Sequence, residues 1–121
     1  MTLHDDIRTA IGSLVAGRYY PTKFPQETGA PTWPAIRGTI VSRDNAIDQC
    51  GAGTDDDDDV LLQLDICAMT YDACYALRIQ VCAAMATAGW IRQPGGGDEW
   101  DSEARVHRAR VDFTLHQSTP Q

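Results

Sequence analysis

The sequence contains no long hydrophobic run. None of its apolar stretches approaches the roughly 20 residues that a membrane-crossing helix needs. The N-terminal segment, MTLHDDIRTA, carries acids where a signal peptide would carry lysines. We therefore expect a protein that is made and kept in a cytosol-like compartment, without a membrane partner. At 121 residues, 43% hydrophobic and 22% charged, the chain has the size and composition of one globular domain, residues 1–121.

Positive charge is in the minority. Ten Lys and Arg stand against 17 Asp and Glu, which gives a formal net charge of -7. A protein this acidic is repelled by phosphate backbones unless its basic residues are segregated into a patch. The basic residues are scattered, and only Arg105, Arg108 and Arg110 lie close together. Direct affinity for nucleic acid is therefore not expected.

Signatures of metal sites and disulfides are also missing. The cysteines form no C-x-x-C pair and have no histidine partners at zinc-finger spacing. His107 and His116 fall in opposite alternation classes of one expected strand, so they point to opposite faces, and His4 lies in a first helical turn. The sequence thus predicts no metal site and no cofactor. We expect four reduced cysteines that act as small buried side chains: Cys50, Cys67, Cys74 and Cys82.

No catalytic constellation is present either. No serine lies in a G-x-S-x-G elbow, and no cysteine has a local active-site signature. Two glycine-rich spots, residues 51–53 and 95–97, lack the strand, glycine loop and helix of a phosphate cradle. We assign no catalytic residue and expect a protein that is not an enzyme and that works through contacts.

The first half of the chain predicts one helix and two strands. Residues 2–16 carry an apolar stripe at spacings of three and four, with Thr2 at the N-cap position and Gly17 as a left-handed stop. The proline-rich residues 18–33 predict a short edge strand and an irregular arm. Residues 35–43 predict a strand in which Gly38 marks a bulge. Residues 44–59 have no periodicity and predict a long loop.

The second half predicts a strand, a helix and two more strands. Residues 60–67 alternate between apolar and other side chains, as in a half-buried strand. A helix follows from an N-cap at Thr70 to a stop at Gly89. Residues 90–93 predict a strand, residues 94–97 a turn, residues 105–116 the last strand, and residues 117–121 a loose tail. The expected fold is α+β, with the order α-β-β-β-α-β-β, an antiparallel or mixed sheet, helices on one face and a polar opposite face.

Five consecutive aspartates stand out against this background: Asp55, Asp56, Asp57, Asp58 and Asp59. An EF-hand loop would need acids at alternate positions, a central glycine and a closing glutamate, none of which fits here. Mutual repulsion is relieved if the run is exposed. A solvated hairpin tip and weak binding of divalent ions remain the alternatives, and a catalytic cluster is disfavoured.

Two further groups could form contacts. Arg105, Arg108 and Arg110 on an exposed strand face form a basic row, which is either solvated or meets the aspartate loop of a neighbouring subunit in a ring. Five aromatic residues form either a surface for a partner or ordinary core and edge packing. They are Tyr19, Tyr20, Trp33, Trp90 and Trp100.

Three segments carry a resemblance to a known family. GRYYPTKFPQETGAPTWP (residues 17–34) resembles a G-x-R-[IV]-[YF]-P opening with later prolines, and LLQLDICAMTYDACYALRIQVCAAM (residues 61–85) resembles a strand that ends in an acidic residue and leads to a T-Y-x-x-A helix. HRARVDFTLHQ (residues 107–117) resembles a closing R-V-x-[LV]-D-F strand. In this order, the segments resemble the tail-completion or tail-terminator proteins of long-tailed bacteriophages. The aspartate run departs from the family's pattern.

The resemblance implies a structural role in the virion and no catalytic residues. Subunits would form a homo-oligomeric ring, a hexamer, at the head-proximal end of the tail tube, assembled in the host cytoplasm. The ring would end tube polymerisation and join the tail to the head, with the tail tube protein and the head–tail connector as partners and DNA only passing through the channel. The aspartate run would then be a channel or interface loop, and the arginine row an inter-subunit contact.

Other functions remain as alternatives. A head–tail connector component, a stopper or adaptor, would also form a ring and differs only in its partner. A small metal-binding enzyme would use the aspartates and should bind divalent ions tightly. An acidic mimic of a basic protein's partner should spread its acids over a face, whereas these acids concentrate in one segment.

Overall fold

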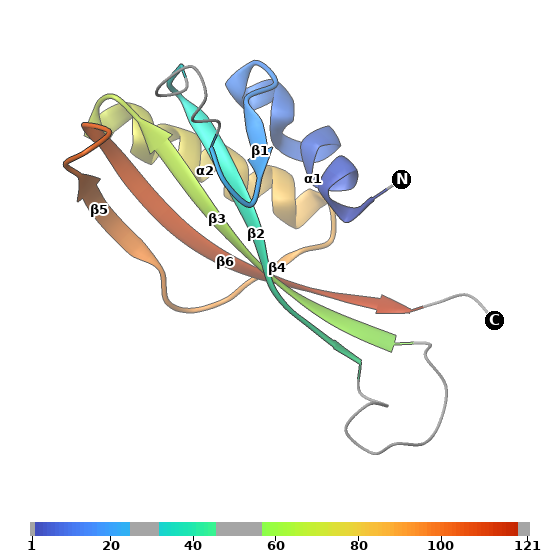
Figure 1. Ribbon diagram of the computed structural model, residues 1–121. Helices are drawn as coiled ribbons and strands as arrows, with labels where there is room; N and C mark the ends of the chain where they lie inside the picture. The colour runs from blue at the N-terminus through green and yellow to red at the C-terminus, as the bar shows by residue number, and fades with distance from the viewer. Residues whose placement is uncertain (1, 25–31, 46–56, 119–121) are drawn as a thin grey trace.

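Two helices cover one face of a six-stranded sheet, and the other face is open (Figure 1). The computed structural model describes residues 2–24, 32–45 and 57–118. The α+β prediction is confirmed, and the structure adds one strand, β5, to the expected order. The elements are α1 (Leu3–Ile11), the 3-10 turn η1 (Gly12–Val15), β1 (Tyr19–Pro21), β2 (Ala35–Asn45), β3 (Asp57–Ala68), α2 (Tyr71–Thr87), β4 (Ile91–Arg92), β5 (Gly97–Asp101) and β6 (Val106–Ser118).

The first helix begins where the sequence predicts and ends earlier. Thr2 and Asp5 form a reciprocal capping box, which satisfies two backbone donors of the first turn. The regular α-helix stops at Ile11 and tightens into η1. Ala16 and Gly17 both have positive φ, 52° and 81°, so the left-handed stop spans two residues.

Gly38 is required for a different reason than the sequence suggests. It pairs regularly with Leu64, and the bulge lies farther along β2, between Ile40 and Ser42. The predicted position of the bulge is therefore wrong. Tyr19 is buried over Gly38, and a Cβ at this position would overlap the tyrosine hydroxyl. Glycine is needed here because another side chain occupies the space of a Cβ.

β3 is the centre of the sheet, between β2 and β6, in the order β1-β2-β3-β6-β4. Only the β1–β2 pair is parallel among the described pairs, and β3 is antiparallel to both neighbours. The side of β3 that faces the helices is completely buried, as its alternation predicts. Its core residues are Val60, Leu62, Leu64 and Ile66.

The long loop expected at residues 44–59 is shorter than predicted. β2 continues to Asn45, and β3 already begins at Asp57, which pairs with Ser118 of β6. β6 accordingly runs to Ser118, so residues 117 and 118 belong to a strand and not to a loose tail. Backbone ladders on both sides of β3 extend the strand into a segment whose aspartates have low strand propensity.

The predicted apolar stripe of α2 packs against the sheet. The Thr70 hydroxyl accepts a hydrogen bond from the backbone of Ala73 at 3.1 Å, which confirms the predicted N-cap. Gly89 follows the helix with φ 97°, as the predicted stop requires. The buried residues of the helix are Cys74, Leu77, Val81 and Met85.

β4 and β5 form one interrupted edge along β6. β4 pairs at Thr114 and Phe113, and β5 pairs from Arg110 to Val106. Between them, Gly95, Gly96 and Gly97 all have positive φ, which lets the chain step outward and return to the same strand. At Gly96 a Cβ would overlap the carbonyl oxygen of Arg110. The predicted glycine turn therefore ends in a strand that the sequence analysis missed.

Candidate functional site: the open sheet face and the outer side of α2

The open sheet face is built around one buried carboxylate. Asp65 lies on β3 opposite the core residues, and its side chain is 0% exposed. The Nε of Arg37, on β2, donates a hydrogen bond to its Oδ2 at 2.9 Å. On the other side, Nε of Arg110, on β6, lies 3.5 Å from its Oδ1. The register places Asp65 directly between these two arginines, which cover it and compensate its charge.

A second set of ion pairs continues toward β5. Arg108 pairs with Glu99 at 3.5 Å and with Asp101, and Arg110 reaches Glu99 at 3.8 Å. Backbone N–H groups of the following turn donate to Asp101, and with Arg108 nearby they hold the pKa of its carboxyl below the usual value. These ion pairs join three arginines of the face with three of its carboxylates.

Two residues of the predicted basic row lie on the open sheet face, and the third does not. Arg108 and Arg110 lie on the open face of β6, as predicted. Arg105 lies before β6, in the turn after β5, with φ 59° and a backbone bond to Asp101. Arg108 and Arg110 already have carboxylate partners in the same chain, so they need no neighbour's aspartates. The sequence could not show this, because β5, which supplies Glu99 and Asp101, was not predicted.

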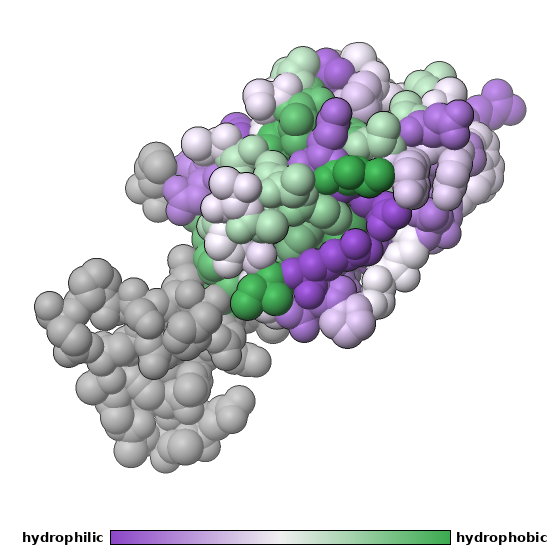
Figure 2. All heavy atoms as spheres, turned by 180° about the vertical axis from the view of Figure 1, so that it is seen from behind, coloured by the Kyte–Doolittle hydropathy of each residue, from purple (hydrophilic) through white to green (hydrophobic). Residues whose placement is uncertain are grey.

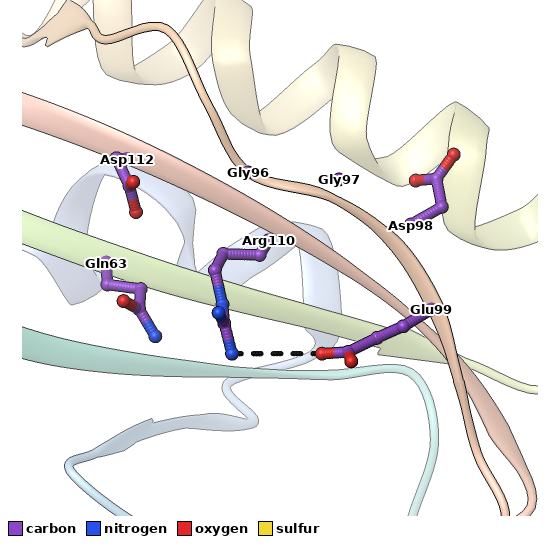
Figure 3. A pocket seen from close by; sticks show the side chains of 7 residues that line it. All are labelled: Gln63, Gly96, Gly97, Asp98, Glu99, Arg110 and Asp112. Carbon is purple, nitrogen blue, oxygen red and sulfur yellow. Dashed lines mark ion pairs between the residues drawn. The ribbon is translucent and has the colours of Figure 1, made fainter.

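A polar hollow of about 290 Å³ lies beside this network (Figure 3). The side chains of Gln63 and Asp112 lie next to each other, and the Arg110–Glu99 pair borders them. Asp112 Oδ1 is buried, and no described residue gives it a hydrogen bond. The volume is at the lower end of the ~300–1,000 Å³ typical of ligand pockets, and the lining is polar. The hollow therefore suits a single side chain better than a cofactor. Its lining is Gln63, Gly96, Gly97, Asp98, Glu99, Arg110 and Asp112.

Only part of the aspartate run lies within the described residues. Asp57, Asp58 and Asp59 begin β3, where they pair with β6, and the last two also pair with β2. Asp55 and Asp56 lie outside the described residues. The ends of β2, β3 and β6 project past the helices at this point (Figure 1). The run is therefore partly strand and not only a hairpin tip.

The aromatic residues divide between core and surface. Tyr19 and Trp90 are buried, while Trp100 is half exposed and packs edge-on against His107 at 4.9 Å between ring centroids. Tyr20 and Trp33 each contact Phe24 edge-on. Core packing is thus confirmed for Tyr19 and Trp90, and a partner surface at the other three residues stays a prediction.

α2 carries a second apolar row that the sequence analysis missed. Tyr71, Tyr75 and Ile79 follow one another at spacings of four, and they are 49%, 46% and 52% exposed. We call these three residues the outer row. Of the 17 residues of α2 only Asp72 and Arg78 are charged. Figure 2 shows the molecule from behind the view of Figure 1, where green side chains gather between purple ones. The four-residue spacing was visible in the sequence beside the buried stripe.

The thiols and histidines form no metal site in the described part of the chain, where no group of three or more possible ligands comes together. Burial raises the pKa of the Cys67 thiol to about 11, which keeps it protonated and unreactive at neutral pH. His4 Nδ1 lies 2.9 Å from the hydroxyl of Tyr19, a structural contact between α1 and β1. The side chain of His107 lies among aromatic residues.

Comparison of the chain with protein-family models and with curated proteins gives no match. Neither helix of residues 2–24, 32–45 and 57–118 is long and apolar enough to cross a membrane.

Proposed function

We propose that the protein is a structural component of a bacteriophage virion, a ring at the head-proximal end of the tail tube. There it ends tube polymerisation and joins the tail to the head. The observation that supports self-assembly is the outer row of α2. A helix that is apolar on both sides is normally covered on both, and the described residues cover only one side of α2. The segment resemblance supports the choice of a tail ring among possible assemblies.

The acidic end of β3 fits the same role. In a ring whose projecting strand ends face the channel, the aspartates repel DNA phosphates, so the genome passes without adhering. Replacing all five aspartates with asparagine then leaves ring assembly intact and impairs DNA passage. Loss of assembly in this variant would instead assign the run to a contact between components.

The proposed function is tested with the tail tube protein of the same phage. Purified protein is added to polymerising tube subunits, and tube length and end structure are measured by electron microscopy. We expect shorter tubes that carry a ring at one end. Tubes of unchanged length without bound protein would refute the role in termination.

Two alternative functions have distinct outcomes in the same series. A protein that binds the head–tail connector and leaves tube length unchanged is a stopper or adaptor. A metal-binding enzyme requires tight, stoichiometric binding of magnesium, which calorimetric titration detects.

A further inference from the structure

We propose that the outer row of α2 in one copy packs on the open sheet face of a second copy, with the Tyr75 side chain in the hollow beside Asp112. The proposal rests on the proposed ring and names its contact surface. Both surfaces belong to the described residues, and neither takes part in the core.

The hollow offers an acceptor that lacks a donor. Asp112 Oδ1 is buried without a hydrogen bond from the described residues, and a buried acceptor left without a donor is unfavourable. A tyrosine hydroxyl supplies the missing donor, and its ring supplies apolar contact area. In the free chain Tyr75 is half exposed, and Arg78 lies 5.2 Å from its ring centroid and supports the ring from one side. Tyrosine is also among the residues that dominate interface energies.

The charges on the open face do not prevent the outer row of a second copy from packing against it. Arg37, Arg108 and Arg110 are each paired with a carboxylate of the same chain. Among the described residues, Asp112 is the carboxylate of this face that lacks an ion pair, and in the proposed contact the Tyr75 hydroxyl donates to it. The outer row contains no charge of its own, so no like charges meet.

The two surfaces flank β5. The hydroxyl of Tyr71, in the outer row, donates to Asp98, which also lines the hollow on the open face of the sheet. A contact between different surfaces of identical chains is heterologous, and it continues from copy to copy until a ring closes. A contact of α2 with α2 would instead be two-fold symmetric and would stop at a dimer.

The strength of one contact follows from the size of the helix. With 17 residues, α2 is about 25 Å long at ~1.5 Å per residue. A strip about 10 Å wide then covers on the order of 250 Å² per partner, against ~800 Å² for a standard stable interface. Single contacts are therefore weak. Closure of a ring, or a tube end that holds the copies together, adds the missing stability.

The test uses two complementary variants. In the first, Tyr75→Lys with Ile79→Lys disables the outer row and leaves the hollow intact. In the second, Gln63→Lys places an ammonium beside Asp112 and fills the hollow while the outer row stays intact. The matched control is Gln80→Lys, an exposed α2 position about 140° around the helix from Tyr75 at 3.6 residues per turn.

Association of the variants is measured by sedimentation velocity over a concentration series. We expect wild type and Gln80→Lys to associate beyond a dimer, and each interface variant alone to stay monomeric. Mixing the two variants restores one functional contact per pair, and because a single contact is weak, the mixture grows no further than a 1:1 dimer. Association of wild type that stops at a dimer, unchanged association of either variant, or a mixture that grows beyond a dimer would each overturn the proposal.

A photo-crosslinking amino acid at position 75 covers the case of weak association. Links to peptides that contain Gln63 or Asp112 of another copy support the contact. Links from α2 to α2, or no links between copies at the highest soluble concentration, refute it.

The same variants in the tube assay separate this contact from the proposed function. If wild type and both variants all end tube growth, the contact is wrong and the function stands. If the mixed dimer forms but wild type never ends tube growth, the contact stands and the function fails.

Discussion

Removal of the Asp65 carboxylate is expected to destabilise the domain far more than removal of any exposed acid on the open face. Asp65 is completely buried, and its partners Arg37 and Arg110 have side chains that are 25% and 42% exposed. Breaking a buried ion pair from one side costs about 3–5 kcal/mol, because the remaining charge is buried without a partner. Here both arginines can turn partly to water, and Arg110 keeps Glu99. We therefore expect a loss of about 2–3 kcal/mol for Asp65→Ala.

The loss is measurable by thermal and urea unfolding followed by circular dichroism. For a domain of this size, 1 kcal/mol corresponds to about 4 °C in Tm, so Asp65→Ala should melt roughly 8–12 °C lower. Glu99→Ala is the comparison, because Glu99 is half exposed and its pairs are longer, which limits its effect to below about 1 kcal/mol. The double variant Asp65→Leu with Arg37→Met removes both charges and should recover most of the stability.

If Asp65→Ala unfolds at the same urea concentration as Glu99→Ala, the buried pair does not stabilise the sheet. If the double variant is less stable than Asp65→Ala alone, desolvation of an uncompensated arginine is not the cause of the loss.

Three other predictions concern single positions. Gly38→Ala forces a methyl group into Tyr19 and should cost about 1–3 kcal/mol in urea unfolding, with part of the loss recovered by Tyr19→Leu. Thr70→Ala removes the N-cap of α2 and should cost about 1 kcal/mol, measured the same way, whereas a loss of zero would mean that water replaces the cap. Burial raises the pKa of Cys67 to about 11 from an unfolded value of 9.0, so its contribution to stability is complete below pH 9 and is lost as the pH rises toward 11. Unfolding free energies between pH 8 and 11 should show this fall, and Cys67→Ala should reduce it.

Several local features could be predicted because they depend on near neighbours in the chain. The alternation from Val60 to Ile66 fixes which side chains of β3 face the core, whatever strands lie beside it. Thr2 and Thr70 cap helices through bonds to residues three positions on, and Gly89 ends α2 through its own backbone freedom.

The residues at which strands begin and end were less predictable, because they depend on which strands pair with one another. Residues 97–101 read GDEWD, which has little strand propensity, yet they form β5 because β6 offers a free edge and the preceding glycines return the chain to it. The same holds for Asp57, Asp58 and Asp59, which extend β3 because β6 continues beside them. Gly38 was correctly singled out, but its role depends on Tyr19, which is distant in sequence.

Composition and spacing were thus enough to predict the fold class, the helix starts, the core side of the central strand and the excess of negative charge. The packing of the folded chain settles how the charges are used. Strand register places Arg37 and Arg110 on either side of Asp65, and β5 brings Glu99 and Asp101 to Arg108. It also decided that the outer row of α2 stays exposed, because whether a helix face is covered depends on what the rest of the chain packs against it.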